Sequence, residues 1–272
     1  MSSKVISVVI PTYKPAEYLD YCLSSLAAQT LPAEQFEVVI VLNGPTTPYQ
    51  AQLEEYASRY SNLDIRLLLS EQAGVSVARN LGISSATGQY VSFVDDDDWL
   101  SPSYLEQLLA LASADSIVAS NIIAIDDASG LQQDFYLTAA YQRLAGVGEL
   151  SVFKARSFLS PVGGKLIPME VIGSDRFDTR FKLGEDSLFL FDISRKVSCV
   201  RLAPSDAVYY YRDRQGSSTR RQFTYGFRLK QAFRVAARYT IIYLKHPFSY
   251  NFAFYLSRVV AQMLKLFYRT YH

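Results

Sequence analysis

The first 100 residues alternate between short apolar, β-branched runs and segments whose apolar residues recur with helical spacing. The runs at residues 4–10, 36–42, 65–69 and 90–94 are short and uninterrupted, which is typical of strands buried on both faces. The segments at residues 16–29, 50–60 and 76–86 predict helices between them. This order predicts a parallel sheet with right-handed crossover connections.

The loops that follow these strands are the expected binding edge, because open parallel sheets bind ligands beyond the carboxyl ends of their strands. They cover residues 11–15, 42–48, 70–76 and 95–101. The second half of the chain is less regular. Its patterns predict a helix at 101–112, a strand at 115–125, mixed structure over 126–182, a buried helix at 187–193 and a strand at 208–212.

Four consecutive aspartates, Asp95 to Asp98, follow the fourth predicted strand. Adjacent carboxylates repel one another unless a cation neutralises them, and oxygen ligands suit Mg²⁺ or Mn²⁺. Asp95 and Asp97 alternate, so they can point to the same side of an extended segment. The alternative is a solvated acidic turn in which Asp98 caps the next element. The position between a buried strand and Trp99 favours metal binding.

A second acidic pair, Glu185-Asp186, stands between a polar loop and the apolar residues 188–191. A carboxylate at such an edge is partly desolvated, which raises its pKa and suits it to accept a proton. The alternative is a helix N-terminal charge stabilised by the helix dipole. Together, the two acidic sites suggest a metal-held diphosphate and a separate general base, a division that fits sugar transfer from a nucleotide diphosphate.

Five ordered segments carry a family resemblance: SVVIPTYKPAEYLDYCLSSLAAQT, GVSVARNLGISSATGQYVSFVDDDDWL, GKLIP, LGEDSLFLF and YYYRDRQGSS. Over about residues 4–220 the chain resembles the bacterial family 2 glycosyltransferases of the GT-A fold, especially the exopolysaccharide, capsule and lipopolysaccharide enzymes. The resemblance implies an α/β fold with a Rossmann-like, mostly parallel central sheet flanked by helices. It also implies inverting transfer of a hexosyl or N-acetylhexosaminyl group from a nucleotide sugar to a hydroxyl of a glycan or lipid-linked oligosaccharide.

The resemblance also implies roles for individual residues. Asp97, with Asp95, matches the metal-binding part of a D-x-D-type segment, and Asp95 or Asp96 would face the ribose or the sugar. Asp186 matches the expected catalytic base. The other matching positions would contact the nucleotide, the donor sugar or the donor phosphates, and they are Pro11, Thr12, Tyr13, Arg79, Asn80, Arg212, Ser217 and Ser218.

One position departs from the family pattern. The second strand of the family usually ends in an acidic residue that contacts the base, whereas this chain has Leu42, followed by Asn43-Gly44-Pro45. Leu42 cannot hydrogen-bond a base, so a uridine nucleotide is not specified. Asn43 either contacts the base or shapes the turn, since Asn-Gly favours positive φ. Lys165 either contacts phosphate or acceptor or is a surface lysine.

The C-terminal segment differs in charge from the rest of the chain. Residues 214–272 contain 11 Lys/Arg and no Asp or Glu, whereas residues 1–213 have a net charge of −10. Helical spacing puts Lys230, Arg234 and Arg238 on one side. The opposite side would carry Leu229, Ala232, Phe233, Ala236, Tyr239 and Tyr243.

Basic amphipathic helices of this kind suit an anionic membrane surface, here through residues 220–272. The alternatives are packing on the acidic body or a homo-oligomer interface. No recognition fold supports a nucleic-acid partner.

We therefore expect a GT-A domain at residues 1–215, with a nucleotide-sugar half at about 1–100 and an acceptor half at about 101–215, and a membrane-associating tail at 216–272. No targeting segment or apolar stretch of ~18 residues is visible, which predicts a cytoplasmic protein at the inner face of the plasma membrane. Two competing functions are a metal-dependent nucleotidyl- or phosphotransferase, although no G-x-x-x-x-G-K-[ST] motif is present, and a non-catalytic membrane-bound nucleotide-sugar-binding module.

Overall fold

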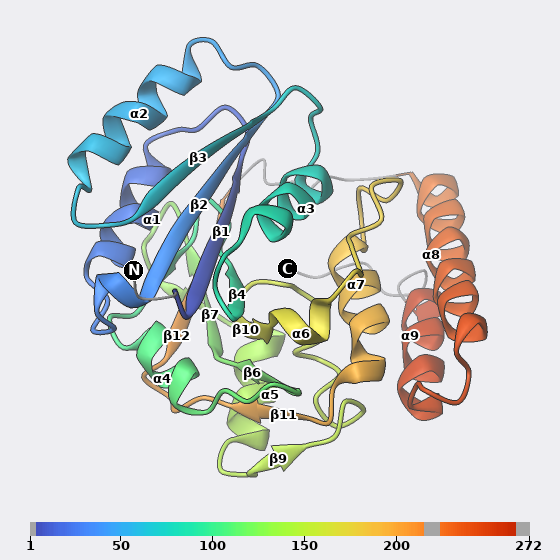
Figure 1. Cartoon of the computed structure of the whole chain (residues 1–272). Coiled ribbons are helices and arrows are strands. Elements are labelled where there is room, and N and C mark those ends of the chain that lie inside the picture. Colours follow the sequence, from blue (N-terminus) through green and yellow to red (C-terminus); the bar gives the residue numbers. More distant parts are fainter. Residues whose placement is uncertain (1–3, 215–223, 265–272) are drawn as a thin grey trace.

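The computed structural model describes residues 4–214 and 224–264, and its largest feature is a mixed, mostly parallel sheet (Figure 1). The strand order among the described residues is β3-β2-β1-β4-β10-β6-β11-β9. The predicted parallel half is confirmed and consists of β1 (Ile6–Thr12), β2 (Phe36–Asn43), β3 (Ile65–Ser70) and β4 (Tyr90–Phe93). The other half contains β6 (Ser116–Ala119), β9 (Glu149–Leu150), β10 (Lys165–Pro168) and β11 (Cys199–Leu202). Strand β10 runs antiparallel to both β4 and β6.

A second, smaller sheet follows the order β5-β12-β7-β8. Its strands are β5 (Trp99–Leu100), β7 (Asn121–Asp126), β8 (Gln132–Gln133) and β12 (Val208–Asp213). The single strand predicted at 115–125 is therefore wrong, because the chain leaves one sheet for the other at Ser120. The amide and hydroxyl of Ser120 both donate to the carbonyl of Gly164 there, at 3.0 and 3.2 Å. The polar pair Ser120-Asn121 interrupts the apolar residues there, but the pattern does not reveal which sheet each half joins.

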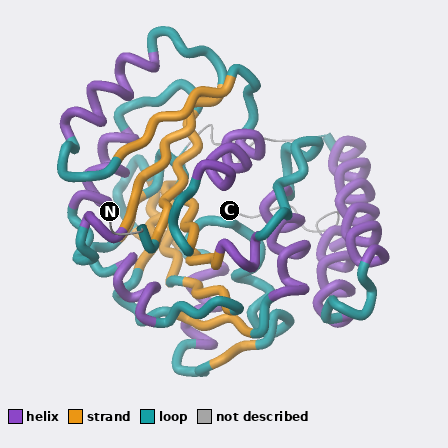
Figure 2. Tube along the Cα trace, in the orientation of Figure 1, coloured by secondary structure: helices purple, strands orange, loops and turns teal. Residues whose placement is uncertain are grey.

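The helices surround the strands (Figure 2). They are α1 (Tyr18–Ala27), α2 (Tyr49–Arg59), α3 (Val75–Ser85), α4 (Tyr104–Ala110), α5 (Tyr136–Leu144), α6 (Met169–Ile172), α7 (Glu185–Ile193), α8 (Tyr225–Lys245) and α9 (Phe252–Leu264), with 3₁₀ turns at Ala33–Gln35 and Ser194–Lys196. The predicted helices of the first 100 residues are confirmed to within a few residues. Helix α3 packs on β1 and β2, and α7, α8 and α9 stand together at one side of the molecule (Figure 1).

Strand β1 continues two residues beyond its predicted end. Pro11 was expected in a loop, but it is buried within β1 and pairs in register with Val41. The carbonyl of Val9 accepts from Val94, so alternate residues of β1, including Pro11, face β4. Strand β4 ends at Phe93, so it does not extend alongside Pro11. The missing N–H of proline therefore costs no hydrogen bond of the sheet.

The C-terminal helices pack on the body of the protein rather than standing apart. Helix α8 contacts α7 and α9, and its buried residues are Ala232, Val235, Ala236, Tyr239 and Ile242. The predicted two-sided arrangement is partly wrong, because Phe233 is 57% exposed and Arg238 lies against the body with Nε 2.9 Å from Asp178 Oδ2. An α-helix has 3.6 residues per turn, so only one stripe of its side chains can be buried against α7 and α9. The ring of Phe233 falls outside that stripe. None of the described helices has the length and apolarity needed to cross a bilayer.

Glycine 82 allows α3 to approach β1 closely. A Cβ at this position would lie 2.3 Å from Val9 Cγ1, in the buried centre of the sheet. We predict that Gly82→Ala lowers the free energy of unfolding by about 1–3 kcal/mol, because overpacking forces the helix away from the strand. Gly226→Ala is the matched control, since Gly226 is also helical but has open space around it, and its helix propensity improves without a collision. Urea denaturation of both variants checks the prediction, and equal stabilities would contradict it.

Candidate functional site

The carboxyl ends of β1 and β4 meet at one edge of the large sheet, as predicted. Thr12 ends β1 and Asp96 lies in the loop after β4. The Thr12 hydroxyl donates to Asp96 Oδ2 at 2.5 Å, so the two loops are joined directly. Since β1 and β4 are parallel neighbours, the fold itself brings these side chains together.

Arg79 joins the two acidic sites that the sequence singled out. It projects from α3, is only 4% exposed, and donates from Nη1 to Asp186 Oδ1 at 2.6 Å and from Nη2 to Asp95 Oδ1 at 2.9 Å. The guanidinium carbon of Arg79 lies 5.5 Å from the centre of the Phe177 ring. The aspartate run and the Glu185-Asp186 pair therefore belong to one site, with a buried cation between them.

Asp186 has both oxygens engaged but keeps 22% of its side chain exposed. Its Oδ2 accepts the backbone N–H of Val162 at 3.0 Å. Burial raises the pKa of Asp186, and the Arg79 guanidinium opposes this rise. Burial also raises the pKa of Glu185 to about 7, and the adjacent Asp186 carboxylate adds to that shift. Both groups lie in the first turn of α7, directly after Gly184 in the left-handed conformation.

The last aspartate of the run has a structural role. Asp98 is buried, accepts the Tyr209 hydroxyl at 2.6 Å, and accepts the backbone N–H of Arg212 at 2.8 Å. The Tyr209 hydroxyl also receives the backbone N–H of Asp95 at 3.2 Å. Asp98 thus ties the acidic loop to β12, whereas the three preceding aspartates contact Arg79, Thr12 and Arg214.

The acidic loop carries more negative charge than its neighbours neutralise. Burial raises the pKa of Asp96 to about 7, with Thr12 opposing and the carboxylates of Asp97 and Asp95 adding to the rise. Burial and Asp95 also raise the pKa of Asp97, although Arg214 Nε lies 2.7 Å from its Oδ2. Such a cluster favours a cation.

The donor set fits one kind of metal site. Across residues 4–214 and 224–264, no three His, Cys, Asp or Glu side chains converge as a ready-made cage. Mg²⁺ needs no such cage where one or two carboxylates and substrate phosphates complete its shell. Asp97 and Asp95 therefore suit a divalent cation that binds together with a diphosphate.

Two amide side chains from the predicted set are used inside the protein. Asn43 Nδ2 donates to the Thr12 carbonyl at 2.7 Å, and its Oδ1 accepts the Gly74 N–H at 2.9 Å. Asn80 makes a reciprocal pair with the backbone of Phe177, at 2.9 and 2.8 Å. These contacts favour the turn-shaping alternative for Asn43 and give Asn80 a role in holding the segment beneath Arg79.

Tyr13 remains available at the edge of the sheet. Its ring is half exposed and lies across Gly44, where an added Cβ would come within 2.5 Å of the ring. Gly44 also has a φ of +117°, so both its conformation and its contact require glycine. The result is an exposed aromatic face between the ends of β1 and β2.

Arg212 is held more tightly than the family resemblance implied. Its Nη1 donates to Asp127 Oδ1 at 3.0 Å, and its guanidinium carbon lies 4.6 Å from the Trp99 ring centre and 4.8 Å from that of Tyr18. Its Nε donates to the carbonyl of Asp97 at 2.8 Å, so it supports the acidic loop from behind. The Ser217-Ser218 pair lies outside the described residues.

Lys165 is not the surface lysine that one sequence alternative described. It is 0% exposed, and its Nζ donates to the Gly163 carbonyl at 2.8 Å. Burial lowers its pKa to about 7, against the effect of Asp186. Because its side chain is covered, it contributes to the wall of the site rather than to a surface that meets a ligand.

Sequence reasoning missed three groups that shape the site. Tyr209 and Arg214 lie in the segment YYYRDR, whose signal was attributed to Arg212 alone. The third is the backbone N–H of Val162, which binds Asp186. Every residue except proline carries such a group, so no sequence signature marks it.

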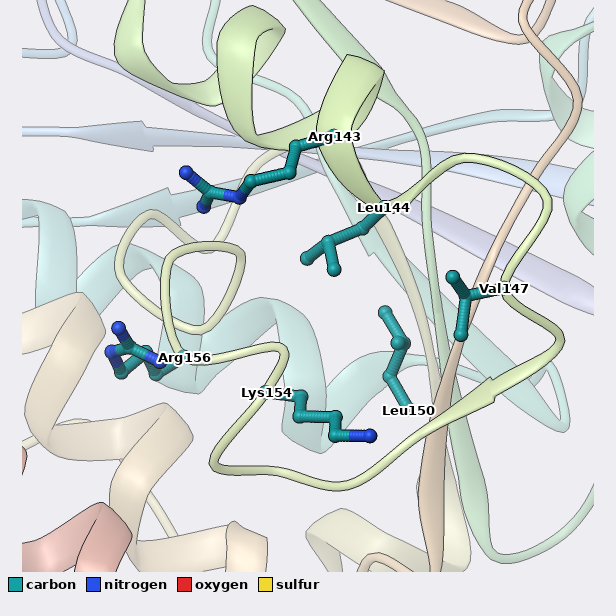
Figure 3. Close-up of a pocket in the computed structure, with 6 residues that line it drawn as sticks. All are labelled: Arg143, Leu144, Val147, Leu150, Lys154 and Arg156. Atoms are coloured by element: carbon teal, nitrogen blue, oxygen red, sulfur yellow. The ribbon is translucent and has the colours of Figure 1, made fainter.

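A separate pocket of about 350 Å³ shares no lining residue with this site (Figure 3). It lies between the end of α5, β9 and the loop that follows. Three cationic and three apolar side chains line it, namely Arg143, Lys154, Arg156, Leu144, Val147 and Leu150. None of the carboxylates of the strand-end edge lines this pocket.

Comparison with known proteins adds relatives of similar sequence and fold. The chain is 32% identical over 231 residues to the glycosyltransferase GlyA of Streptococcus pneumoniae, a match that covers 79% of this chain and 31% of GlyA. It is 26% identical over 216 residues to the poly(ribitol-phosphate) beta-N-acetylglucosaminyltransferase TarS of Staphylococcus aureus, covering 77% of this chain and 36% of TarS. The chain thus spans about a third of the length of these relatives.

Two solved structures share the fold. TarS residues 1–349 in complex with UDP superpose with a TM-score of 0.71 at 20% identity, over 97% of this chain and 72% of that one. The mannosyltransferase PcManGT of Pyrobaculum calidifontis, in complex with GDP-Man and Mn²⁺, gives a TM-score of 0.64 at 18% identity, over 98% and 70%.

The match to a family model agrees with these similarities and with the expected GT-A fold. The model described as "Glycosyl transferase family 2" matches residues 7–154, more than half of the chain, from β1 through the acidic loop to the turn after β9. The protein is a member of glycosyl transferase family 2.

Proposed function

We propose that this glycosyltransferase moves a hexosyl or N-acetylhexosaminyl group, with inversion, from a nucleotide diphosphate sugar to a hydroxyl of a cell-surface glycan or a lipid-linked oligosaccharide. The observation that carries the proposal is the bridge from Arg79 to Asp95 and Asp186. It puts the groups proposed to hold the donor and to deprotonate the acceptor on opposite sides of one guanidinium. A sugar bound there would have its departing phosphate and its attacking hydroxyl within a single site.

The donor is assigned to residues 1–100 and the acceptor to about 101–215, with residues 216–272 as an appendage. We assign contact with the nucleoside to Thr12, Tyr13 and Asp96, supported by the hydrogen bond between Thr12 and Asp96 and by the exposed ring of Tyr13. Bound at Asp97 and Asp95, Mg²⁺ or Mn²⁺ would neutralise charge on the leaving diphosphate. Leu42 is fully buried, so recognition of the base falls to other groups.

Asp186 is the proposed base. Arg79 and the Val162 N–H each occupy one lone-pair position on a different oxygen, and a carboxylate offers about four such positions. The remaining positions can accept the hydroxyl proton of the acceptor. Burial favours this step because it raises the pKa of Asp186 above that of a solvated aspartate. Attack from the face opposite the departing diphosphate inverts the anomeric centre, with a transition state of oxocarbenium character.

The relatives support the substrate class but do not fix its members. One solved relative holds UDP, and another holds GDP-Man with Mn²⁺. TarS is named for transfer to poly(ribitol-phosphate). Accordingly, we assign this chain a nucleoside diphosphate sugar as donor and a cell-surface polysaccharide or its lipid-linked precursor as acceptor.

The outer faces of α8 and α9 support a peripheral position on an anionic membrane at the cytoplasmic face. Both helices expose apolar side chains, namely Phe227, Phe233, Ile241, Leu244, Phe252, Leu256, Val260 and Leu264, and the connection between the helices adds Phe248. Lys230 and Lys245 of α8 are exposed as well. Apolar side chains with basic neighbours match the headgroup region of a bilayer, and a lipid-linked acceptor would be held there. The competing occupant is a second copy of the chain.

Replacing the proposed base separates chemistry from donor binding. Asp186→Asn should lower kcat for sugar transfer by about a hundredfold or more, since an amide cannot take the proton, and should leave donor affinity within about twofold. Nucleoside diphosphate release with a saccharide acceptor measures the rate. Wild-type turnover in the variant would remove Asp186 as the base. Pyrophosphate or sugar phosphate as the product would favour the nucleotidyl- or phosphotransferase, and an inactive wild type would favour the binding module.

Replacing the proposed metal ligand tests the cation site. Asp97→Ala should abolish the Mn²⁺-dependent part of donor binding, because the cation and the diphosphate bind together. Isothermal titration of UDP-sugars and GDP-sugars, with Mn²⁺ or with chelator, measures this dependence. Asp134→Ala is the control, since Asp134 is exposed and lies outside the site. The same Mn²⁺ dependence in wild type and Asp97→Ala would contradict the assignment.

The membrane partner is tested on the outer face of the C-terminal helices. Leu244→Ser with Phe248→Ser should weaken co-sedimentation with phosphatidylglycerol-containing vesicles by about tenfold or more, because each buried apolar side chain contributes ~1.5–3 kcal/mol. Leu131→Ser is the matched control, because Leu131 is 68% exposed on another part of the protein. If vesicle binding is unchanged and a dimer seen by ultracentrifugation is lost instead, the face joins two copies of the chain.

A further inference from the structure

Arg258 is a buried cation that holds a loop from another part of the chain. It lies in α9, is 7% exposed, and pairs with no carboxylate among the residues the structure describes. Its Nη2 donates to the carbonyls of Arg156 and of Leu159, the latter at 3.1 Å, and its Nη1 donates to Ser160 Oγ at 3.3 Å. A buried guanidinium without an ion-pair partner needs acceptors for its N–H groups, and these three acceptors serve Nη1 and Nη2, whereas the buried Nε has no hydrogen-bond partner.

The loop that Arg258 holds leads directly to the proposed base. Two residues beyond Ser160, the backbone N–H of Val162 donates to Asp186 Oδ2 at 3.0 Å. Gly163 follows and forms a bridge with Phe93, the last residue of β4. The loop is therefore held by α9 at one end and by the central sheet at the other, and the hydrogen bond to Asp186 lies between them.

Helix α8 provides a second attachment, on the other side of Asp186. Gln231 Nε2 donates to the carbonyl of Leu183 at 2.9 Å, and the Tyr239 hydroxyl donates to Ser187 Oγ at 2.8 Å. Leu183 and Ser187 flank the turn that carries Asp186, three residues before and one residue after it. The C-terminal helices therefore contact the chain on both sides of this residue.

We propose that the α8–α9 pair is a positioning element of the active site, in which Arg258 orients Asp186 through the loop that ends at the Val162 N–H. The proposal rests on the proposed function, because it assumes that Asp186 accepts the proton. An orientation error of about 1 Å at a reacting group can cost about a hundredfold in rate. Arg258 itself touches neither substrate nor reacting atoms and acts only through the loop.

Substitution of Arg258 tests this role. Arg258→Met keeps the length of the side chain and removes its donors, whereas Arg258→Lys restores one charged donor. We expect Arg258→Met to lower kcat by about tenfold to a hundredfold with donor affinity within about twofold, and Arg258→Lys to recover part of the rate. Val259→Ala is the matched control, because it trims the neighbouring core-packing side chain of α9 without touching the loop.

Two further readouts separate positioning from a general loss of packing. The Val162 amide should exchange with deuterium faster in Arg258→Met than in Val259→Ala. The charged groups that face Asp186 are Arg79 from α3, Asp95 after β4, Lys165 from β10 and its own neighbour Glu185. None of them is substituted, but the Arg258 charge lowers the pKa of Lys165, so the pH profile is read on Arg258→Lys, which keeps that charge. Since the Val162 N–H lowers the pKa of Asp186, its weakening should move the acid limb of the kcat/KM profile to higher pH.

The outcomes distinguish this proposal from the proposed function. A wild type that transfers sugar, together with a folded Arg258→Met whose kcat and Val162 exchange are unchanged and an Arg258→Lys whose acid limb is unchanged, overturns the positioning role alone. Loss of rate equal to that of Val259→Ala also overturns it. Wild-type turnover in Asp186→Asn overturns the proposed function instead. If Arg258→Met does not fold, Tyr239→Phe decides, since it removes only the α8 hydroxyl, and an unchanged kcat then overturns the proposal.

Discussion

The candidate active site depends on one buried guanidinium that two carboxylates share. Arg79 stands 16 residues before Asp95 and 107 residues before Asp186, and it binds both. The cation, 4% exposed, could not be buried without compensating charge, and Asp95 and Asp186 supply it while remaining 45% and 22% exposed. The same three groups therefore fix the relative position of the loop after β4 and the first turn of α7. In the proposed function, their separation sets the space in which a donor and an acceptor would meet.

The sheet determines where that guanidinium lies. Gly82 lets α3 rest directly on β1, and Arg79 is one turn earlier on the same helix. Strand β4 lies beside β1, so the aspartate run emerges next to Thr12 and within reach of Arg79. The remaining side of the site depends on segments much later in the chain, which no short-range pattern connects to it. Those segments are held by hydrogen bonds to α8 and α9.

The parallel half of the fold and the residues at its edge were predictable, since uninterrupted β-branched runs mark buried strands and strand ends mark the binding edge. The continuation of β1 through Pro11 was not, because it depends on where β4 stops. The change of sheet at Ser120 falls at the polar pair Ser120-Asn121, and the apolar residues on both sides of this pair have the same pattern in either sheet. Arg79 and Asp186 were each singled out, but their contact follows from tertiary packing. The tail was expected to be helical and amphipathic. The sequence did not predict which of its aromatic rings are buried, because that depends on the packing of α8 against α7.

The C-terminal helices have an inner and an outer face, so their proposed roles in positioning Asp186 and in binding a membrane can be tested by separate substitutions. The inner face supplies Arg258, Gln231 and Tyr239 to the segments around Asp186, whereas the outer face exposes Leu244, Phe248 and other apolar side chains. Deleting the helices would remove both faces, so a truncated chain that fails to transfer sugar says nothing about membrane binding. Substitutions on the outer face leave the inner hydrogen bonds intact, and those on the inner face leave the apolar surface intact. Because the same rigid helices carry both faces, binding to a surface would orient the active site relative to it, which is what an acceptor anchored in a bilayer requires.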